Sequence, residues 1–346
     1  MVGRNRQSRK QRSSGAAAFV FMAFLIALLA GGVAAWLVLE PFGPTSETFV
    51  EVEPGTSTTH IGEQMQAAGV IRSRYAFQLL RLWKQGTLRA GEYRFDHPAT
   101  AAEVYARIAR GDVFTRAVTI PEGATIFDVA ARLEQAGLGV RQDFLVSAAG
   151  QTGLVADLDP GAKSLEGYLF PDTYHLPRKA TPEQICATMV HRFRAAAAQL
   201  GLQKDVHAVV TLASLVERES ALDAERPLVA SVFENRLAKG MPLMTDPAVI
   251  YGLQLQNRWR GTIYQSDLTR DTAYNTYLHK GLPPGPIANP GVRSLRAAME
   301  PATTDYLYFV AAGANPQGHS LFSSSLDEQN RNVAGYRNAV KKAGGR

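Results

Sequence analysis

The chain has 346 residues, of which 46% are hydrophobic and 20% charged, so it is long enough for one to three domains with a sizeable core. Its formal net charge of +6 comes from residues 1–39, which hold five basic residues and no acidic one; the remainder has 32 basic and 31 acidic residues. This near-neutral remainder gives no support for nucleic-acid binding, and the single cysteine, Cys186, excludes an intramolecular disulfide or a cysteine-rich metal site.

Residues 16–39 form an uncharged, strongly apolar run of 24 residues. As a helix this run is about 36 Å long, enough to span a bilayer. A basic tail, residues 1–15, precedes it, so the positive-inside rule predicts a cytoplasmic N-terminus and a body outside the membrane. The rival interpretation is a cleavable signal peptide, whose apolar core is usually only about 7–15 residues. We therefore expect an uncleaved single-pass helix, followed by a linker over residues 40–52.

A weak internal repeat relates residues 53–71 to residues 121–139 at a shift of 68 positions. Each copy indicates the end of a strand, a glycine turn, a Ser/Thr cap, an amphipathic helix and a glycine stop, and a second helix follows. The pattern predicts a small α+β module over residues 53–156. A β-Gly-helix-helix unit resembles a LysM-type glycan-binding module, although a purely structural spacer fits the same pattern.

The rest of the chain, residues 157–346, has the signals of a mixed α+β domain. The aromatic run over residues 165–174 predicts either a buried strand or one wall of a sugar-binding cleft. Helices are predicted over residues 182–200, 206–220, 228–238 and 326–342, and a buried strand over residues 306–310.

Two carboxylates follow the apolar stripe of the helix predicted over residues 206–220. At 100° per residue Glu217 and Glu219 fall on opposite shoulders of that stripe. A carboxyl group there is partly desolvated, which raises its pKa and suits a general acid. An ordinary helix whose polar face begins at Glu217 gives the same pattern, and periodicity does not choose between the two residues.

Other chemistries have no local signature. The seven histidines lack paired spacing, and no GxSxG, SxxK, Walker or GxGxxG pattern occurs, so we expect neither a metal nor a cofactor. What remains is carboxylate chemistry beside loops rich in Asn, Tyr and Pro, which suit sugar rings and hydroxyls.

The second half of the chain resembles the MltG (YceG-like) family of endolytic murein transglycosylases. The matching blocks include EGYLFPDTY (166–174), LASLVERES (212–220), TDPAVIYG (245–252), AYNTYLHKGLPPGPIANPG (273–291) and DYLYFVAAG (305–313). The resemblance implies an inner-membrane anchor, a LysM-like part and a periplasmic catalytic domain that cuts MurNAc–GlcNAc bonds of peptidoglycan, ending nascent strands. Candidate protein partners are penicillin-binding synthases or elongation and division complexes.

The resemblance also implies site residues. The catalytic residue would be the first glutamate of its block, Glu217, which protonates the glycosidic oxygen while the C6 hydroxyl of the same MurNAc closes a 1,6-anhydro ring. By our own interpretation Glu219 is either a helper residue or merely solvated, and we favour solvation. We interpret seven further residues as sugar-binding or orienting groups: Asn235, Arg236, Asp246, Tyr251, Tyr274, Asn275 and Tyr277. Arg236 is equally compatible with a structural salt bridge, for which Glu225 is the candidate partner.

Two departures from the family pattern affect these expectations. Ala248 replaces a common threonine, and Gln329 replaces a histidine near the C-terminus, so a catalytic role for His319 is not expected. Two other functions stay open: a lysozyme-like hydrolase that pairs Glu217 with Asp246 or Glu219, and a non-catalytic wall-binding scaffold.

Overall fold

The structure is a computed structural model that describes residues 7–84, 86–314 and 318–344, with the side chains of residues 7–15 and 344 left out. Residues 1–6 of the predicted basic tail therefore lie outside the described residues, and residues 7–15 are described by their backbone alone. The chain divides into two compact units, Met1–Thr115 and Arg116–Arg346.

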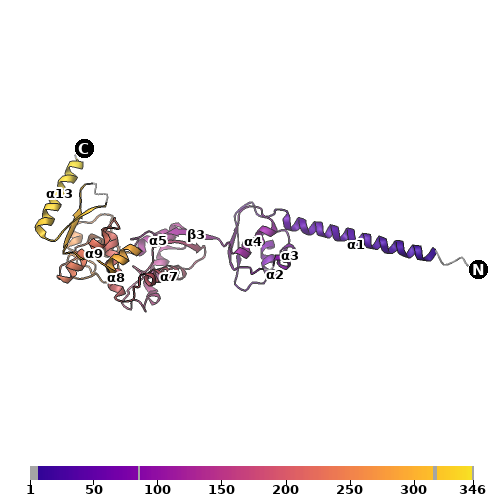
Figure 1. Cartoon of the computed structure of the whole chain (residues 1–346), viewed down its shortest axis with the longest axis horizontal. Helices are drawn as coiled ribbons and strands as arrows, with labels where there is room; N and C mark the ends of the chain where they lie inside the picture. Colours follow the sequence, from indigo (N-terminus) through magenta and orange to yellow (C-terminus); the bar gives the residue numbers. More distant parts are fainter. Residues whose placement is uncertain (1–6, 85, 315–317, 345–346) are drawn as a thin grey trace, which may run out of the picture. The chain divides into compact units, whose positions relative to one another are not determined.

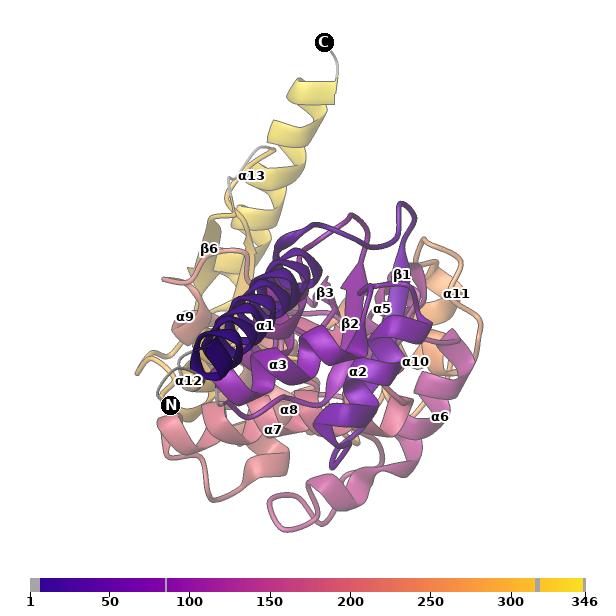
Figure 2. The same cartoon turned by 90° about the vertical axis from the view of Figure 1, so that its right-hand side faces the viewer.

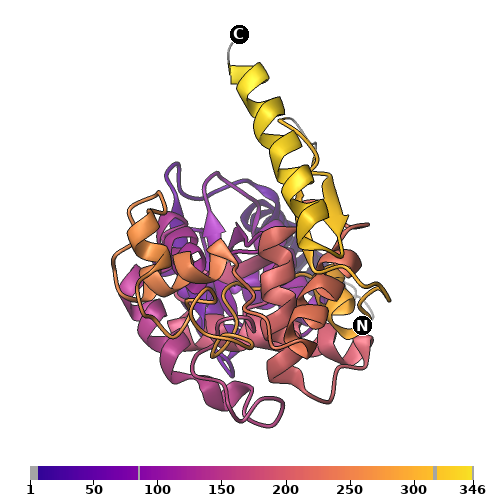
Figure 3. The same ribbon diagram turned by 90° about the vertical axis from the view of Figure 1, so that its left-hand side faces the viewer.

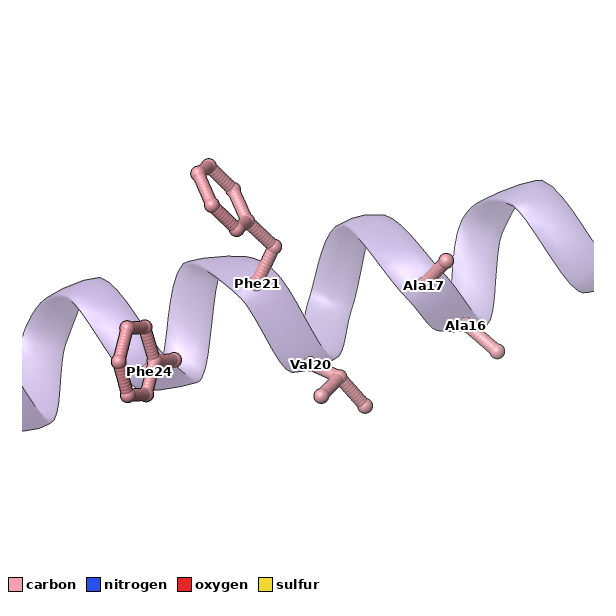
Figure 4. Close-up of a pocket in the computed structure, with 5 residues that line it drawn as sticks. All are labelled: Ala16, Ala17, Val20, Phe21 and Phe24. Atoms are coloured by element: carbon pink, nitrogen blue, oxygen red, sulfur yellow. The ribbon is translucent and has the colours of Figure 1, made fainter.

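Helix α1 (Gln7–Leu39) opens unit 1 (Figure 1). Its segment Ala16–Leu39 is long and apolar enough to cross a membrane, with a mean hydropathy of 2.5 and no part of it buried. Figure 4 shows phenylalanine and valine side chains standing out from this isolated helix. Only its C-terminal end meets the rest of unit 1, where Leu37 and Val38 pack against the core. The predicted helix over residues 16–39 is confirmed.

The rest of unit 1 is a two-stranded antiparallel sheet covered by three helices. Val50 pairs with Tyr93 in the register of the sheet, and both side chains are buried. Apolar residues of the helices cover them, among them Phe77, which packs on Tyr105 with ring centroids 5.1 Å apart. The elements are β1 (Thr48–Val52), α2 (Thr58–Ala67), α3 (Arg74–Lys84), β2 (Gly91–Phe95) and α4 (Ala101–Arg110).

Both copies of the internal repeat form the local structure that the sequence predicts. The turn glycines, Gly55 and Gly123, have φ values of 83° and 75°, which favour glycine. Ser57 and Thr125 then cap the following helices by accepting a hydrogen bond from a first-turn amide. The repeat thus encodes two similar strand–turn–helix–helix units.

The two copies belong to different units, however. The helices of the second copy, α5 (Ile126–Gln135) and α6 (Arg141–Gly150), bury Leu133 and Phe144 in the core of unit 2. The division at Thr115 therefore does not coincide with the predicted boundary at 156/157. Similar local sequence patterns therefore do not determine in which hydrophobic core the apolar face of a helix is buried.

Unit 2 is mostly helical around α8 (Val206–Glu219), which packs against α9 (Arg226–Ala238) and α12 (Val292–Met299). The short strands β3 (Thr115–Thr119) and β4 (Thr173–Pro177) form a two-stranded sheet. The remaining elements are η1 (Thr152–Leu154), α7 (Pro182–Leu200), α10 (Asp246–Leu255), α11 (Gln265–Leu268), β5 (Tyr308–Ala311), β6 (Ser320–Ser323) and α13 (Leu326–Gly344). The yellow C-terminal helix α13 stands beside the β5–β6 hairpin (Figure 3).

The aromatic run over residues 165–174 belongs to the core of unit 2. Tyr168 and Phe170 are buried, and the strand begins only at Thr173. The Tyr168 ring meets Phe193 edge-on at 5.1 Å, and its hydroxyl donates to Asp159 at 2.5 Å. Of the two interpretations, burial is correct for these aromatic side chains, and they form no sugar-cleft wall.

Candidate functional site

Helix α8 carries two glutamates in its last turn, and they point into different surroundings. The helix ends at Ser220, which takes an extended conformation with φ −111° and ψ 122°. The side chains of Glu217 and Glu219 therefore project from this last turn on opposite sides of the apolar face, as the periodicity predicts.

Glu217 is held by two strong interactions. Its Oε1 accepts a hydrogen bond from Arg226 Nη1 at 2.8 Å, and its Oε2 accepts one from the Gly291 amide at 2.9 Å. The Glu217 and Arg226 side chains are only 5% and 7% exposed, so this is a buried ion pair. Through its two carboxylate oxygens, Glu217 thus links α8 to α9 and to the start of α12.

Arg226 extends this ion pair into a network. Its Nη1 also donates to Ser294 Oγ at 2.7 Å, and its Nε donates to Asp223 at 3.2 Å. Glu122 Oε2 lies 4.0 Å from Arg226 Nη2, and burial together with the nearby charge of Glu217 raises the pKa of Glu122. A Cβ atom at position 291 would collide with the Glu122 carboxyl group, which would then have to turn aside.

Glu219 instead lines a cavity of about 240 Å³. Burial, and then the neighbouring charge of Asp246, raises the pKa of Glu219 to about 7, although Thr245, Arg218 and Arg236 act in the opposite direction. Glu219 is half-buried, so the expectation that it is solvated is wrong. A carboxyl group with such a pKa is partly protonated at neutral pH and can donate a proton. The lining residues are Glu219, Phe233, Arg236, Leu243, Met244, Thr245, Asp246, Pro247, Tyr277 and Phe309.

Three of the predicted sugar-binding residues line the same cavity as Glu219. Asp246, the first residue of α10, accepts a hydrogen bond from the Tyr277 hydroxyl at 2.6 Å. Arg236 donates to the carbonyl oxygens of Leu307 and Leu243 at 2.7 Å each. These bonds fix the guanidinium at the cavity wall.

The predicted salt bridge between Arg236 and Glu225 is wrong. Glu225 Oε1 lies 3.3 Å from His319 Nδ1 and accepts a bond from the Ser320 amide at 3.2 Å. Arg236 bonds to backbone carbonyls instead.

The other four predicted residues have structural contacts and do not line this cavity. Asn235 donates to the carbonyls of Thr304 and Tyr306 at 2.9 Å each. Asn275 is fully buried and donates to the carbonyls of Leu268 and Arg270 at 3.0 and 2.7 Å. The rings of Tyr251 and Tyr274 meet edge-on at 5.0 Å.

A buried Glu166–Asn289 pair, which sequence reasoning missed, braces the loop before α12. Asn289 Oδ1 accepts from the Gly167 and Leu169 amides at 3.0 and 2.9 Å, and its Nδ2 donates to Glu166 Oε1 at 3.0 Å. Burial raises the pKa of Glu166 to about 8. The only signal available was that both residues fall in the long sequence blocks quoted above.

Among the described residues there is no group of three or more His, Cys, Asp and Glu side chains placed to hold a metal ion. The described part of the site thus offers two carboxyl groups, of Glu219 and Asp246, with the Arg236 guanidinium and the Tyr277 hydroxyl.

Comparisons with known proteins identify the family of this chain. The model of the YceG-like family matches residues 50–335. The endolytic murein transglycosylase of Bacillus subtilis (strain 168) is 32% identical over 317 residues, covering 85% of this chain and 86% of that protein. The enzyme of the same name from Streptococcus pneumoniae (strain D39) is 29% identical over 363 residues, covering 92% of this chain but 65% of that longer protein. A crystal structure of a YceG-like protein from Listeria monocytogenes has a TM-score of 0.54 and 31% identity, covering 83% of this chain and 99% of that one. This chain belongs to the YceG-like family.

Proposed function

We propose that the protein is a membrane-anchored lytic transglycosylase that cleaves peptidoglycan strands internally, with Glu219 as its general acid. The observation that carries this proposal is a glutamate whose pKa is raised to about 7 on the wall of a cavity that also holds Arg236, Asp246 and Tyr277. The names of the Bacillus and Streptococcus relatives support murein as the substrate.

Glu219 replaces Glu217, the residue that the family resemblance implied. Both carboxylate oxygens of Glu217 are engaged, one by a buried arginine and one by a backbone amide. These contacts occupy both oxygens and hold the side chain in place, so neither oxygen is free to meet a glycosidic oxygen. Glu219 combines a desolvated carboxyl group with access to a cavity, as a general acid requires.

The reaction needs only one such acid. Glu219 gives its proton to the glycosidic oxygen between MurNAc and GlcNAc, and the bond from that oxygen to C1 of MurNAc breaks. The C6 hydroxyl oxygen of the same MurNAc bonds to C1 and closes a 1,6-anhydro ring, while the Glu219 carboxylate takes the hydroxyl proton. An attached nucleophile acts at high effective molarity, so no second carboxylate is needed to activate water.

Asp246 supports one competing function. It is a second carboxyl group on the same cavity wall, and a lysozyme-like hydrolase uses two carboxyl groups. The hydrogen bond from Tyr277 and the exposed position of Asp246 fit a residue that orients a sugar hydroxyl or raises the pKa of Glu219 equally well.

Analysis of cleaved glycan ends tests these functions. Purified peptidoglycan is digested with the wild type, Glu219→Gln and Glu217→Gln, and the new ends are identified by mass spectrometry. We expect anhydro ends from the wild type, a loss of about 10²–10⁴-fold in rate for Glu219→Gln, and far smaller losses per folded molecule for Glu217→Gln. Reducing ends would indicate hydrolysis instead. Full function of both variants in cells would favour a non-catalytic scaffold.

The membrane topology and the role of unit 1 belong to the same proposal. The apolar segment Ala16–Leu39 and the basic residues before it support a single-pass anchor with a cytoplasmic N-terminus. This topology leaves the part of unit 1 that follows α1, and all of unit 2, on the periplasmic side of the inner membrane. The strand–turn–helix–helix architecture of unit 1 supports glycan contact of the LysM type. Termination of nascent strands beside synthases is the corresponding cellular role.

A further inference from the structure

Helix α3 exposes an apolar face that no described residue of unit 1 covers. Tyr75, Leu79, Leu82 and Trp83 are 60%, 47%, 76% and 81% exposed. At 100° per residue these four side chains share one arc about 100° wide, next to the buried arc of Ala76, Phe77 and Leu80. A continuous exposed apolar face of this kind marks an interaction surface.

This face lies beside the point where the apolar part of α1 ends. Helices α1 and α3 pack together, and the Arg72 guanidinium stacks over Trp36 and Phe42 at 4.7 and 4.8 Å. Pro41, just after α1, and Lys84, the last residue of α3, line one groove. Viewed along α1 from its N-terminal side, α3 is among the foremost elements of unit 1 (Figure 2). Helix α3 thus lies on the side of unit 1 from which α1 arrives.

The chemistry around this face suits a lipid surface. Residues 64–91 contain no acidic residue and five basic ones, namely Arg72, Arg74, Arg81, Lys84 and Arg89; of these, Arg74 is paired with Glu63 of α2. Tryptophan and tyrosine favour the headgroup level of a bilayer, and basic side chains beside them attract anionic phospholipids. A short helix with leucine and tryptophan on one face and arginine on the other is typical of helices that lie in the plane of a membrane.

We propose that the face formed by Tyr75, Leu79, Leu82 and Trp83 lies in the lipid headgroup layer of the membrane that α1 spans. The proposal rests on α1 being a membrane anchor. It gives the protein two attachments to one bilayer, so unit 1 is held against the surface and does not hang from a flexible tether.

Electron paramagnetic resonance of nitroxide labels in the full chain tests this surface. Labels are placed one at a time through Leu79→Cys, Trp83→Cys, Ile26→Cys in α1 and Val113→Cys outside α3, in vesicles of phosphatidylethanolamine and phosphatidylglycerol. Burial raises the pKa of the Cys186 thiol to about 11, so the native cysteine stays unlabelled. Collisions with oxygen report lipid contact, and collisions with a water-soluble nickel complex report water contact.

We expect the oxygen-to-nickel collision ratio at positions 79 and 83 to exceed that at position 113 several-fold, and to be highest at position 26. If position 26 is in lipid while positions 79 and 83 match position 113, the α3 proposal is overturned and the anchor stands. Shielding of positions 79 and 83 from both reagents would assign the face to a second copy or a protein partner, which also overturns it. Water contact at position 26 would remove the anchor itself, and neither result depends on Glu219 chemistry.

Discussion

Glu217 and Glu219 lie two residues apart at the end of α8, yet their surroundings differ. The comparison shows how the same type of side chain can stabilise the fold at one position and be suited to proton transfer at another. Glu217 sits opposite Arg226 and the Gly291 amide, and its charge holds three elements together. Glu219 faces a cavity where burial and Asp246 disfavour its charge. A glutamate can brace a fold when its charge is matched, and can give up a proton when it is not.

The largest effect expected from this contrast is on stability. Glu217→Ala leaves the buried Arg226 without its closest carboxylate, so we expect the free energy of unfolding to fall by about 3–5 kcal/mol. Glu219→Ala removes a desolvated acid and should change it by less than about 1 kcal/mol near pH 4.5, where that acid is neutral in the folded chain. Urea unfolding of the detergent-solubilised chain, followed by circular dichroism, measures both. Equal losses would contradict the division of roles.

A second effect concerns the pH dependence of stability. The pKa of Glu219 is about 7 in the folded chain and about 4.5 when unfolded. The folded state therefore binds this proton more tightly. The resulting stabilisation is complete below pH 4.5 and is lost as the pH rises through 7. Relative to Glu219→Gln, the wild type should lose up to about 3 kcal/mol of unfolding free energy between pH 4.5 and 8. If the unfolding free energies of the two proteins changed in parallel with pH, the pKa of Glu219 would not be raised in the folded chain.

The smallest effect is on the pH profile of cleavage. A general acid works only while protonated, so kcat/KM should fall as the pH rises above about 7. Asp246→Asn removes a charge that raises the pKa of Glu219, and we expect the alkaline limb to move to lower pH. Tyr277→Phe is the matched control, because it deletes the hydroxyl bonded to Asp246 but keeps the charge. An unmoved limb in Asp246→Asn would show that Asp246 does not tune the acid.

Sequence patterns predicted the helices around this site better than the tertiary contacts between them. The helix with both glutamates, the capped helix that begins at Pro182 and ends before Gly201, and the final helix from Leu326 follow from periodicity and caps. Periodicity also placed the two carboxyl groups on opposite shoulders of α8.

Which shoulder faces a cavity depends on residues far along the chain. Gly291 closes over Glu217 from 74 positions away, and Tyr277 reaches Asp246 from 31 positions away. Asn235 and Asn275 were predicted to bind sugar because asparagine side chains suit sugar hydroxyls. Their side-chain amides instead donate hydrogen bonds to backbone carbonyls. Residue type gives the possible chemistry, and only the tertiary contacts show which side chains are already occupied.

The contacts of the Arg226 side chain also limit which residues can replace it. Its planar guanidinium donates from Nη1 to both Glu217 and Ser294, and from Nε to Asp223. A lysine would keep the positive charge but gather all its N–H groups on a single atom. Such an exchange, conservative by charge, would leave at least one of α8, α9 and α12 without its tie to the other two.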